Sequence, residues 1–209
     1  MEKLALGAGE AGVFLSHQQL DQFETYYQEL ARWNRRVNLT SITGYQEVQV
    51  GHFLDSLTVC LAAPESMSFH SRVVDVGAGG GFPGLPMKLA FPDVHLVLLD
   101  AVGKKAAFLE HLVALLELDG VEVLTGRAED LAHRPDLRES FDLALARGLA
   151  QLPVLLEYSL PFCRIGGKTV AHKHGGLDTE LQSAARALET LGGRLWSQVP
   201  VQVTGLTDN

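Results

Sequence analysis

Residues 73–84, with the sequence VVDVGAGGGFPG, constrain the fold of this chain more than any other segment. A short apolar run ends in closely spaced glycines, and a helical pattern begins directly after them. Glycines are needed where a chain turns sharply after a strand and where a ligand approaches the backbone with no Cβ in the way. In an open parallel sheet, such a turn lies beyond the carboxyl end of the first strand. The segment therefore predicts an α/β protein that binds a nucleotide-like ligand at this turn.

Short apolar runs alternate with helical periodicity through the rest of the chain. The apolar runs predict strands, and the spacing of apolar positions between them predicts helices. Strands separated by helices favour a doubly wound, mostly parallel sheet with right-handed crossovers. The predicted strands cover residues 73–76, 95–100, 121–124, 141–146, 168–171 and 195–203.

Two helices are predicted in front of this sheet. Ser16 and Gln19 have the spacing of a capping box, so the first helix begins at Ser16. The second helix covers residues 45–63 and ends before Pro64. We therefore expect a small N-terminal helical cap over residues 1–68 and a ligand-binding domain over residues 69–209. The predicted inward face of the first helix carries Leu20, Phe23, Tyr27, Leu30 and Asn34.

The charge and the cysteines of the chain exclude several classes of protein. The net charge is −8, so contact with a nucleic acid requires a local basic patch. No apolar run approaches the roughly 20 residues that span a bilayer. Cys60 and Cys163 are far apart, which argues against a disulfide framework or a cysteine zinc site.

We expect a soluble cytoplasmic protein. His172 and His174 alternate across a predicted strand, so no metal site is expected.

Two ligand classes fit the glycine-rich segment. Gly79, Gly81 and Gly84 match the dinucleotide pattern GxGxxG, and Asp100 follows 21 residues after Gly79, a suitable distance for an acid that binds a ribose. An NAD(P)-binding oxidoreductase is therefore one possibility. Asp100 ends a strand, where its carboxylate is expected to accept hydrogen bonds from the ribose hydroxyls of an adenosine.

The second ligand class is S-adenosylmethionine (SAM), and three features favour it. Asp75 and the alternating glycines from Gly77 resemble motif I of class I SAM methyltransferases, and Gly77 follows the strand directly. Pro83 and Pro86 stand at the helix start, where a pyrophosphate would need free N–H donors. Residues 126–130, after the third strand, resemble the loop that brackets the adenine in those enzymes.

The residues after the fourth strand bear on the methyl acceptor. A sulfonium methyl is already activated, so the protein mainly supplies proximity and orientation. The Asn/Asp-Pro-Pro-aromatic loop typical of amine methylation is absent, and neither Cys60 nor Cys163 is placed to act as a nucleophile. These features favour an acceptor with a free lone pair, such as guanine N7. Arg147 would then anchor a phosphate, the guanine edge or the cofactor carboxylate.

Six segments together resemble the RsmG (GidB) family of bacterial 16S rRNA guanine-N7 methyltransferases. They are WNxxVNLT at 33–40, HFLDSL at 52–57, DVGAGGGFPG at 75–84, KKxxFL at 104–109, RAE at 127–129 and AR at 146–147. The resemblance implies a Rossmann-like class I fold, SAM as methyl donor, and a guanosine in the decoding-centre loop of 16S rRNA as acceptor. It also implies 16S rRNA or the small ribosomal subunit as partner, and we expect a monomer.

Residue by residue, the resemblance places Gly77, Phe82, Ala128, Glu129 and Arg147 at cofactor-contact positions, and the strand–turn pattern adds Gly79 and Asp100. His52 and Asp55 share a helix face, and we expect them to form a hydrogen-bonded pair that holds the cap on the domain. The predicted basic patch for RNA consists of Arg35, Arg36, Lys104, Lys105 and Lys173, with Arg32 and Arg147 nearby.

The chain also departs from the family pattern in two places. Lys173 is followed by His174 where the family has glycine, and the final antiparallel strand of the family has no counterpart before Asn209. A small-molecule SAM methyltransferase and a non-catalytic RNA-binding module remain alternatives to an rRNA methyltransferase.

Overall fold

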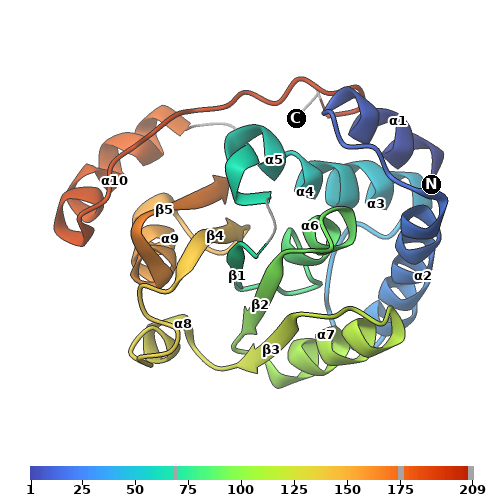
Figure 1. Ribbon diagram of the computed structural model, residues 1–209, viewed down its shortest axis with the longest axis horizontal. Coiled ribbons are helices and arrows are strands. Elements are labelled where there is room, and N and C mark those ends of the chain that lie inside the picture. The colour runs from blue at the N-terminus through green and yellow to red at the C-terminus, as the bar shows by residue number, and fades with distance from the viewer. Residues whose placement is uncertain (68–69, 174–176, 207–209) are drawn as a thin grey trace.

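A five-stranded parallel sheet forms the centre of the computed structural model, which describes residues 1–67, 70–173 and 177–206 (Figure 1). The strand order is β3-β2-β1-β4-β5, and every neighbouring pair is parallel. The predicted doubly wound parallel sheet is therefore confirmed. The strands are β1 (Arg72–Val76), β2 (His95–Asp100), β3 (Val121–Thr125), β4 (Phe141–Arg147) and β5 (Cys163–His172).

Helices cover both faces of this sheet, because alternate residues of each buried strand point to opposite sides. Val73 and Leu98 belong to the core under α6 and α7, whereas Val74 and Leu99 belong to the core on the other face, with Ala128 of α8. The helices after β1 are α6 (Gly84–Ala90), α7 (Gly103–Leu115), α8 (Ala128–Leu131), α9 (Leu152–Ser159) with a 3₁₀ turn η3 (Leu160–Phe162), and α10 (Leu177–Leu191).

The N-terminal helices pack on the α6–α7 side of the sheet, as Figure 1 shows. Phe23, Tyr26 and Phe53 lie in the same hydrophobic core as Leu96 and Leu98 of β2. The predicted boundary at residues 68 and 69 lies outside the described residues. The N-terminal elements are α1 (Glu2–Glu10), α2 (His17–Asn34), α3 (Tyr45–Val48), a π-helical turn η1 (Gln49–Leu54), α4 (Asp55–Leu57), α5 (Val59–Ala62) and η2 (Pro64–Met67).

The capping box at the start of α2 is confirmed. The Gln19 N–H donates to Ser16 Oγ at 3.2 Å, and the Ser16 N–H donates to Gln19 Oε1 at 2.8 Å. The predicted inward face was wrong by one residue, since Tyr26 is fully buried and Tyr27 is not. The helix predicted over 45–63 is divided by η1 into short pieces, and α1 was not predicted at all.

The strand predicted over residues 195–203 is wrong. This segment is extended but belongs to no strand, and it crosses the molecule from α10 to α1 (Figure 1). Its apolar residues are buried at one end only, where Val203 lies in the core of the N-terminal helices. Both the N–H and the hydroxyl of Thr204 donate to the Glu10 carboxylate at 2.9 Å. Among the described residues, no helix is both long and apolar enough to span a bilayer.

Candidate functional site

The turn after β1 is hydrogen-bonded to the end of β2. The N–H groups of Gly77 and Ala78 both donate to the Leu99 carbonyl, at 2.8 and 3.0 Å. Gly77, Gly79 and Gly81 have φ values of 75°, 58° and 95°, in the left-handed region that favours glycine. The glycines predicted from the sequence therefore allow this turn to form at the carboxyl edge of the sheet.

The three glycines differ in what a Cβ atom would meet. At Gly77 it would lie 2.5 Å from a Leu149 methyl, and at Gly81 it would lie 2.4 Å from Tyr26 Oη. At Gly79 it would meet only the Gly77 carbonyl oxygen, at 3.8 Å. Gly81 is thus required by packing against buried side chains, whereas the Leu149 methyl at Gly77 ends a partly buried side chain that can move. Gly79 leaves open space through which a ligand can approach the backbone.

Asp100 joins three segments at this edge. Its Oδ2 accepts the Gly79 N–H and its Oδ1 accepts the Val102 N–H, both at 2.8 Å, and its carbonyl accepts the Gly126 N–H at 3.1 Å. Each carboxylate oxygen has a second lone pair, so these bonds leave capacity for hydroxyl donors. The predicted contact between Asp100 and a ribose stays a prediction.

Asp75 is fully buried beneath the glycine turn. Its Oδ2 accepts the Gly84 N–H at 2.8 Å, and its Oδ1 has no partner among the described residues. Burial raises the pKa of the Asp75 carboxyl to about 7, although the Gly84 N–H and Arg147 act to lower it. A buried acceptor without a donor fits a ligand that brings positive charge, and SAM carries both a sulfonium and an ammonium group.

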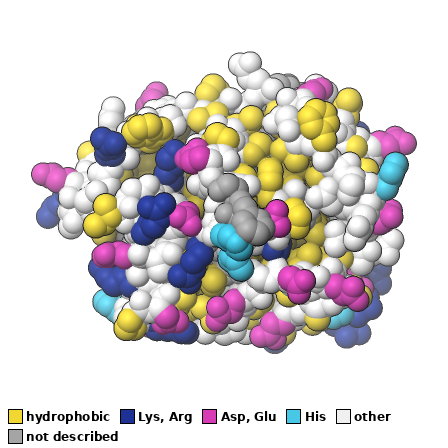
Figure 2. Space-filling model, viewed as in Figure 1, with side chains coloured by type: hydrophobic (Ala, Val, Ile, Leu, Met, Phe, Trp, Pro, Cys, Tyr) yellow, Lys and Arg dark blue, Asp and Glu magenta, His cyan; other side chains and the backbone are white. Residues whose placement is uncertain are grey.

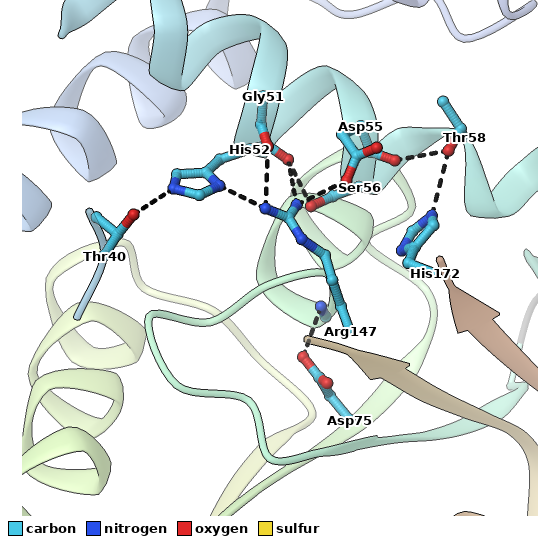
Figure 3. A network of polar contacts seen from close by, with 10 residues as sticks. Thr40, Gly51, His52, Asp55, Ser56, Thr58, Asp75, Arg147 and His172 are labelled. Atoms are coloured by element: carbon cyan, nitrogen blue, oxygen red, sulfur yellow. Dashed lines mark hydrogen bonds and ion pairs between the residues drawn. The ribbon is translucent and has the colours of Figure 1, made fainter. Parts of the chain in front are cut away.

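Arg147 extends from the end of β4 to the η1 turn, and Asp75 lies near the base of its side chain (Figure 3). Arg147 Nη2 donates to the Gly51 carbonyl at 2.9 Å and to His52 Nδ1 at 2.6 Å. Nη1 donates to the His52 carbonyl at 3.4 Å and forms an ion pair with Asp55 Oδ2 at 2.8 Å. The Asp55 contact is ionic, because that oxygen accepts no directed hydrogen bond. His52 and Asp55 are thus joined through Arg147, and not by the direct hydrogen bond expected from the sequence.

The partners of His52 fix its tautomer. A guanidinium has no acceptor, so His52 Nδ1 must accept from Arg147 and the proton must lie on Nε2. Nε2 then donates to Thr40 Oγ1, at 2.6 Å. Burial, and then the Arg147 charge, lower the pKa of His52 to about 4, so the ring is neutral at pH 7.

Aromatic rings connect this network to the glycine turn. The His52 ring stacks on Phe82, with centroids 4.3 Å apart, and Phe82 stacks in turn with Tyr26. The Arg147 guanidinium lies 5.6 Å from the Phe82 ring centroid. The structure therefore places Phe82 between the turn and the N-terminal helices, where it is only 7% exposed.

Sequence reasoning gave no site role to two residues that hold these parts together, Tyr26 and Asn34. Tyr26 Oη donates to the Gly80 carbonyl at 2.5 Å, and so binds α2 to the glycine turn. The Asn34 side chain accepts the N–H groups of Leu39 and Thr40 and donates to the Thr40 carbonyl. Asn34 therefore presents Thr40 to His52. The spacing of Phe23, Tyr26 and Leu30 was the available signal for Tyr26.

The other predicted cofactor residues lie at the start of α8. Ala128 is buried against the sheet, and Glu129 is exposed and accepts from Arg127 Nε at 2.9 Å. Among residues 1–67, 70–173 and 177–206, no group of three His, Cys, Asp or Glu side chains is placed to hold a metal ion. His174 lies outside these ranges.

Four of the predicted RNA-binding residues lie at the same end of the helix pair α2 and α7. Helices α2 and α7 lie side by side and antiparallel, so Arg35 and Arg36 at the end of α2 lie toward Lys104 and Lys105 in the first turn of α7. Three contacts between the helices fix this direction: Gln22 with Leu116, Glu29 with His111, and Trp33 with Phe108.

Lys173 stands apart from this group. It follows β5, the strand farthest from β3 in the sheet, and its Nζ is 2.7 Å from Glu180 Oε2 and 2.8 Å from the Ala150 carbonyl oxygen. Arg32, at the outer face of α2, pairs with Glu29 at 3.3 Å.

Comparison with known proteins identifies the family. Residues 19–204 match the GidB family model, which is described as rRNA small subunit methyltransferase G. The chain belongs to this family. A relative of the same name from Dehalococcoides mccartyi is 45% identical over 208 residues, which cover 100% of this chain and 87% of the relative. Another, from Roseiflexus castenholzii, is 45% identical over 99% of this chain and 87% of its own length.

Solved structures support the fold assignment of this chain. A putative SAM-dependent methyltransferase from Methanococcus maripaludis matches with a TM-score of 0.50 and 14% identity, over 69% of this chain and 67% of its own. A mutant of MtNAS in complex with SAM matches with a TM-score of 0.51 and 15% identity, over 78% and 59%. The predicted class I fold and the predicted family are confirmed, and the chain is a SAM-dependent methyltransferase. The alternative of a dinucleotide-binding oxidoreductase is not retained.

Alanine substitutions at Gly79 and Gly81 are expected to separate ligand binding from folding. Gly79→Ala adds a methyl group on the open side and strains the backbone by about 1–2 kcal/mol, so we expect a folded protein whose affinity for SAM falls at least ~10-fold. Gly81→Ala adds a clash with the buried Tyr26 and Leu85 side chains to the same strain and should lower thermal stability more. Calorimetric titration with SAM and thermal unfolding test both. Native affinity in Gly79→Ala would show that the open side does not face the cofactor.

Asp75 should make the stability of the protein depend on pH. Its pKa is about 7 in the fold and about 4 when unfolded, so folding takes up a proton between these values. Because the folded pKa is raised, the contribution of Asp75 to stability is lost as pH rises from about 4 to about 7. The asparagine in Asp75→Asn cannot ionise. The melting temperature of this variant minus that of the native protein should therefore increase from pH 5 to pH 8. Asp21→Asn, a surface change, is the control, and an equal pH trend in both variants would contradict the expectation.

Proposed function

We propose that this methyltransferase transfers the methyl group of SAM to N7 of a guanosine in the decoding-centre loop of 16S rRNA, in the cytoplasm. The observation that carries the proposal is the state of His52, which stacks on Phe82 of the glycine turn. Its Nδ1 lone pair accepts from Arg147, and its Nε2 carries the proton. His52 therefore cannot take a proton from an acceptor, and guanine N7, with its own lone pair, has no proton to lose.

The residues of this chain then have positioning roles. Bound SAM supplies an electrophilic methyl group on a sulfonium. The backbone at Gly79 and the carboxylates of Asp75 and Asp100 are proposed to bind and orient the cofactor, together with Ala128 and Glu129 at the adenine. Phe82 and Arg147 form the wall between this site and the N-terminal helices. Proximity and in-line orientation account for the rate enhancement that such a site needs to provide.

The RNA is proposed to bind along Arg35, Arg36, Lys104 and Lys105. Acidic side chains interrupt the basic ones across the face shown in Figure 2, and the net charge is −8, so this face offers no continuous basic surface. A local group of exposed cations is what an acidic protein needs to bind phosphates. Lys104 and Lys105 begin α7 directly after β2, at the same edge of the sheet as the glycine turn.

Methyl transfer can be followed with tritiated SAM. We expect label to enter 16S rRNA, or the small subunit, purified from a strain that lacks the family's activity, and to map to N7 of a single guanosine. Particles from a strain with the activity intact are the control and should accept little label. Label confined to small metabolites would favour a small-molecule methyltransferase, and RNA binding without label would favour a non-catalytic module.

Reversal of two charges tests the RNA surface. Arg35→Glu with Arg36→Glu should weaken rRNA binding at least ~10-fold at low salt and reduce the slope of log K against log salt by about one for each lost phosphate contact. Lys3→Glu with Arg186→Glu, on the exposed surface of α1 and α10, makes the same change in net charge and should have little effect. SAM affinity should be native in both. Unchanged rRNA affinity at low salt would remove the end of α2 from the RNA surface.

A further inference from the structure

The two terminal nitrogens of the Arg147 guanidinium are held within the protein by three hydrogen bonds and one ion pair. Its two Nη atoms carry four N–H groups. These face the Gly51 carbonyl, His52 Nδ1, the His52 carbonyl and Asp55 Oδ2 at 2.9, 2.6, 3.4 and 2.8 Å. The side chain stands at the end of β4, beside the glycine turn, and both of its terminal nitrogens are directed to η1 and α4.

The π-helical turn η1 provides this set of acceptors. Two of its carbonyls, from Gly51 and His52, turn toward Arg147, and its own imidazole supplies the third acceptor. Asp55 follows directly in α4 and adds the negative charge. Wide turns of this kind are found often at functional sites. The partners come from a segment about a hundred residues away in sequence, so they are specific to the folded protein.

An arginine with free N–H donors beside the guanine would interfere with methyl transfer to N7. Arginine commonly donates to both O6 and N7 of guanine, and a donor at N7 occupies the lone pair that has to attack the methyl group. An arginine at the rim of an N7 site therefore has to be directed away from that nitrogen. The contacts of Arg147 achieve this.

We infer that His52 is a positioning residue for methyl transfer, which engages Arg147 and so keeps the arginine donors away from the accepting nitrogen. This rests on the proposed transfer to guanine N7. His52 does not itself touch the reacting atoms. The part of its ring that matters is Nδ1, because Nε2 points to Thr40. The ring is neutral at pH 7, so the acceptor at Nδ1 is available there.

Two substitutions separate the ring nitrogens. In His52→Asn, the amide oxygen stands where Nδ1 stood and can accept from Arg147, but the bond to Thr40 is lost. In His52→Gln, the amide nitrogen reaches the place of Nε2 and can donate to Thr40, but Arg147 loses an acceptor. Both variants remove the stacking on Phe82, so this loss is matched between them.

The experiment measures kcat and KM of both variants with 16S rRNA or small subunits that lack the modification, together with SAM affinity by calorimetry. We expect His52→Asn to retain kcat within about threefold, and His52→Gln to lose at least ~10-fold in kcat with KM for the RNA unchanged or lower. Replacing Arg147 in the Gln variant by Lys, which has no fork, should return part of the lost kcat.

Equal kcat in the two variants would overturn the inference. Loss of SAM binding or of folded structure in both would assign His52 to the fold alone and would also overturn it. If the native protein methylates an RNA atom other than guanine N7, the proposed function fails, and this is seen in the mapped product before any variant is compared.

Discussion

A buried cation at the end of β4 determines how the two parts of this protein meet. The Arg147 side chain is 14% exposed, and burial lowers its pKa, while Asp55 and Asp75 act to raise it. A buried charge left without partners costs roughly 3–5 kcal/mol. Most of the Arg147 partners lie on η1 and α4. Separation of the N-terminal helices from the sheet would remove these partners and so carry this free-energy cost. These helices form one wall of the site, together with the cofactor turn.

The parts of the fold that sequence reasoning predicted depend on local patterns. The glycines after residue 76 signal a turn because few other residues adopt positive φ there, and the apolar runs of β1, β2 and β4 are buried on both faces. The capping box of α2 is likewise set by two residues three apart. Such features need no knowledge of distant contacts, which is why β1 to β4 and the first turn were predicted to within one residue, whereas β5 is longer than the predicted 168–171.

The features that were missed depend on contacts between distant segments. The choice of Tyr26 over Tyr27 as the buried residue is made by the Gly80 carbonyl and the Phe82 ring, 54 and 56 positions away. The apolar alternation over 195–203 indicated a strand, but Val203 packs against the N-terminal helices and Thr204 binds Glu10. The π-helical turn has no local signal, because its carbonyls are stabilised by an arginine from β4.

The contacts also give physical meaning to motifs that the sequence offered only as a resemblance. Asn34 of WNxxVNLT orders the backbone at Leu39 and Thr40, and Thr40 Oγ1 accepts from His52 of HFLDSL. His52 then accepts from Arg147, which follows Ala146 at the end of β4, and stacks on Phe82 of the glycine turn. Segments separated by more than a hundred residues thus form one connected set of contacts. Because these side chains contact one another in series, the motifs act as a unit, and the effects of changing them on methyl transfer should not be additive.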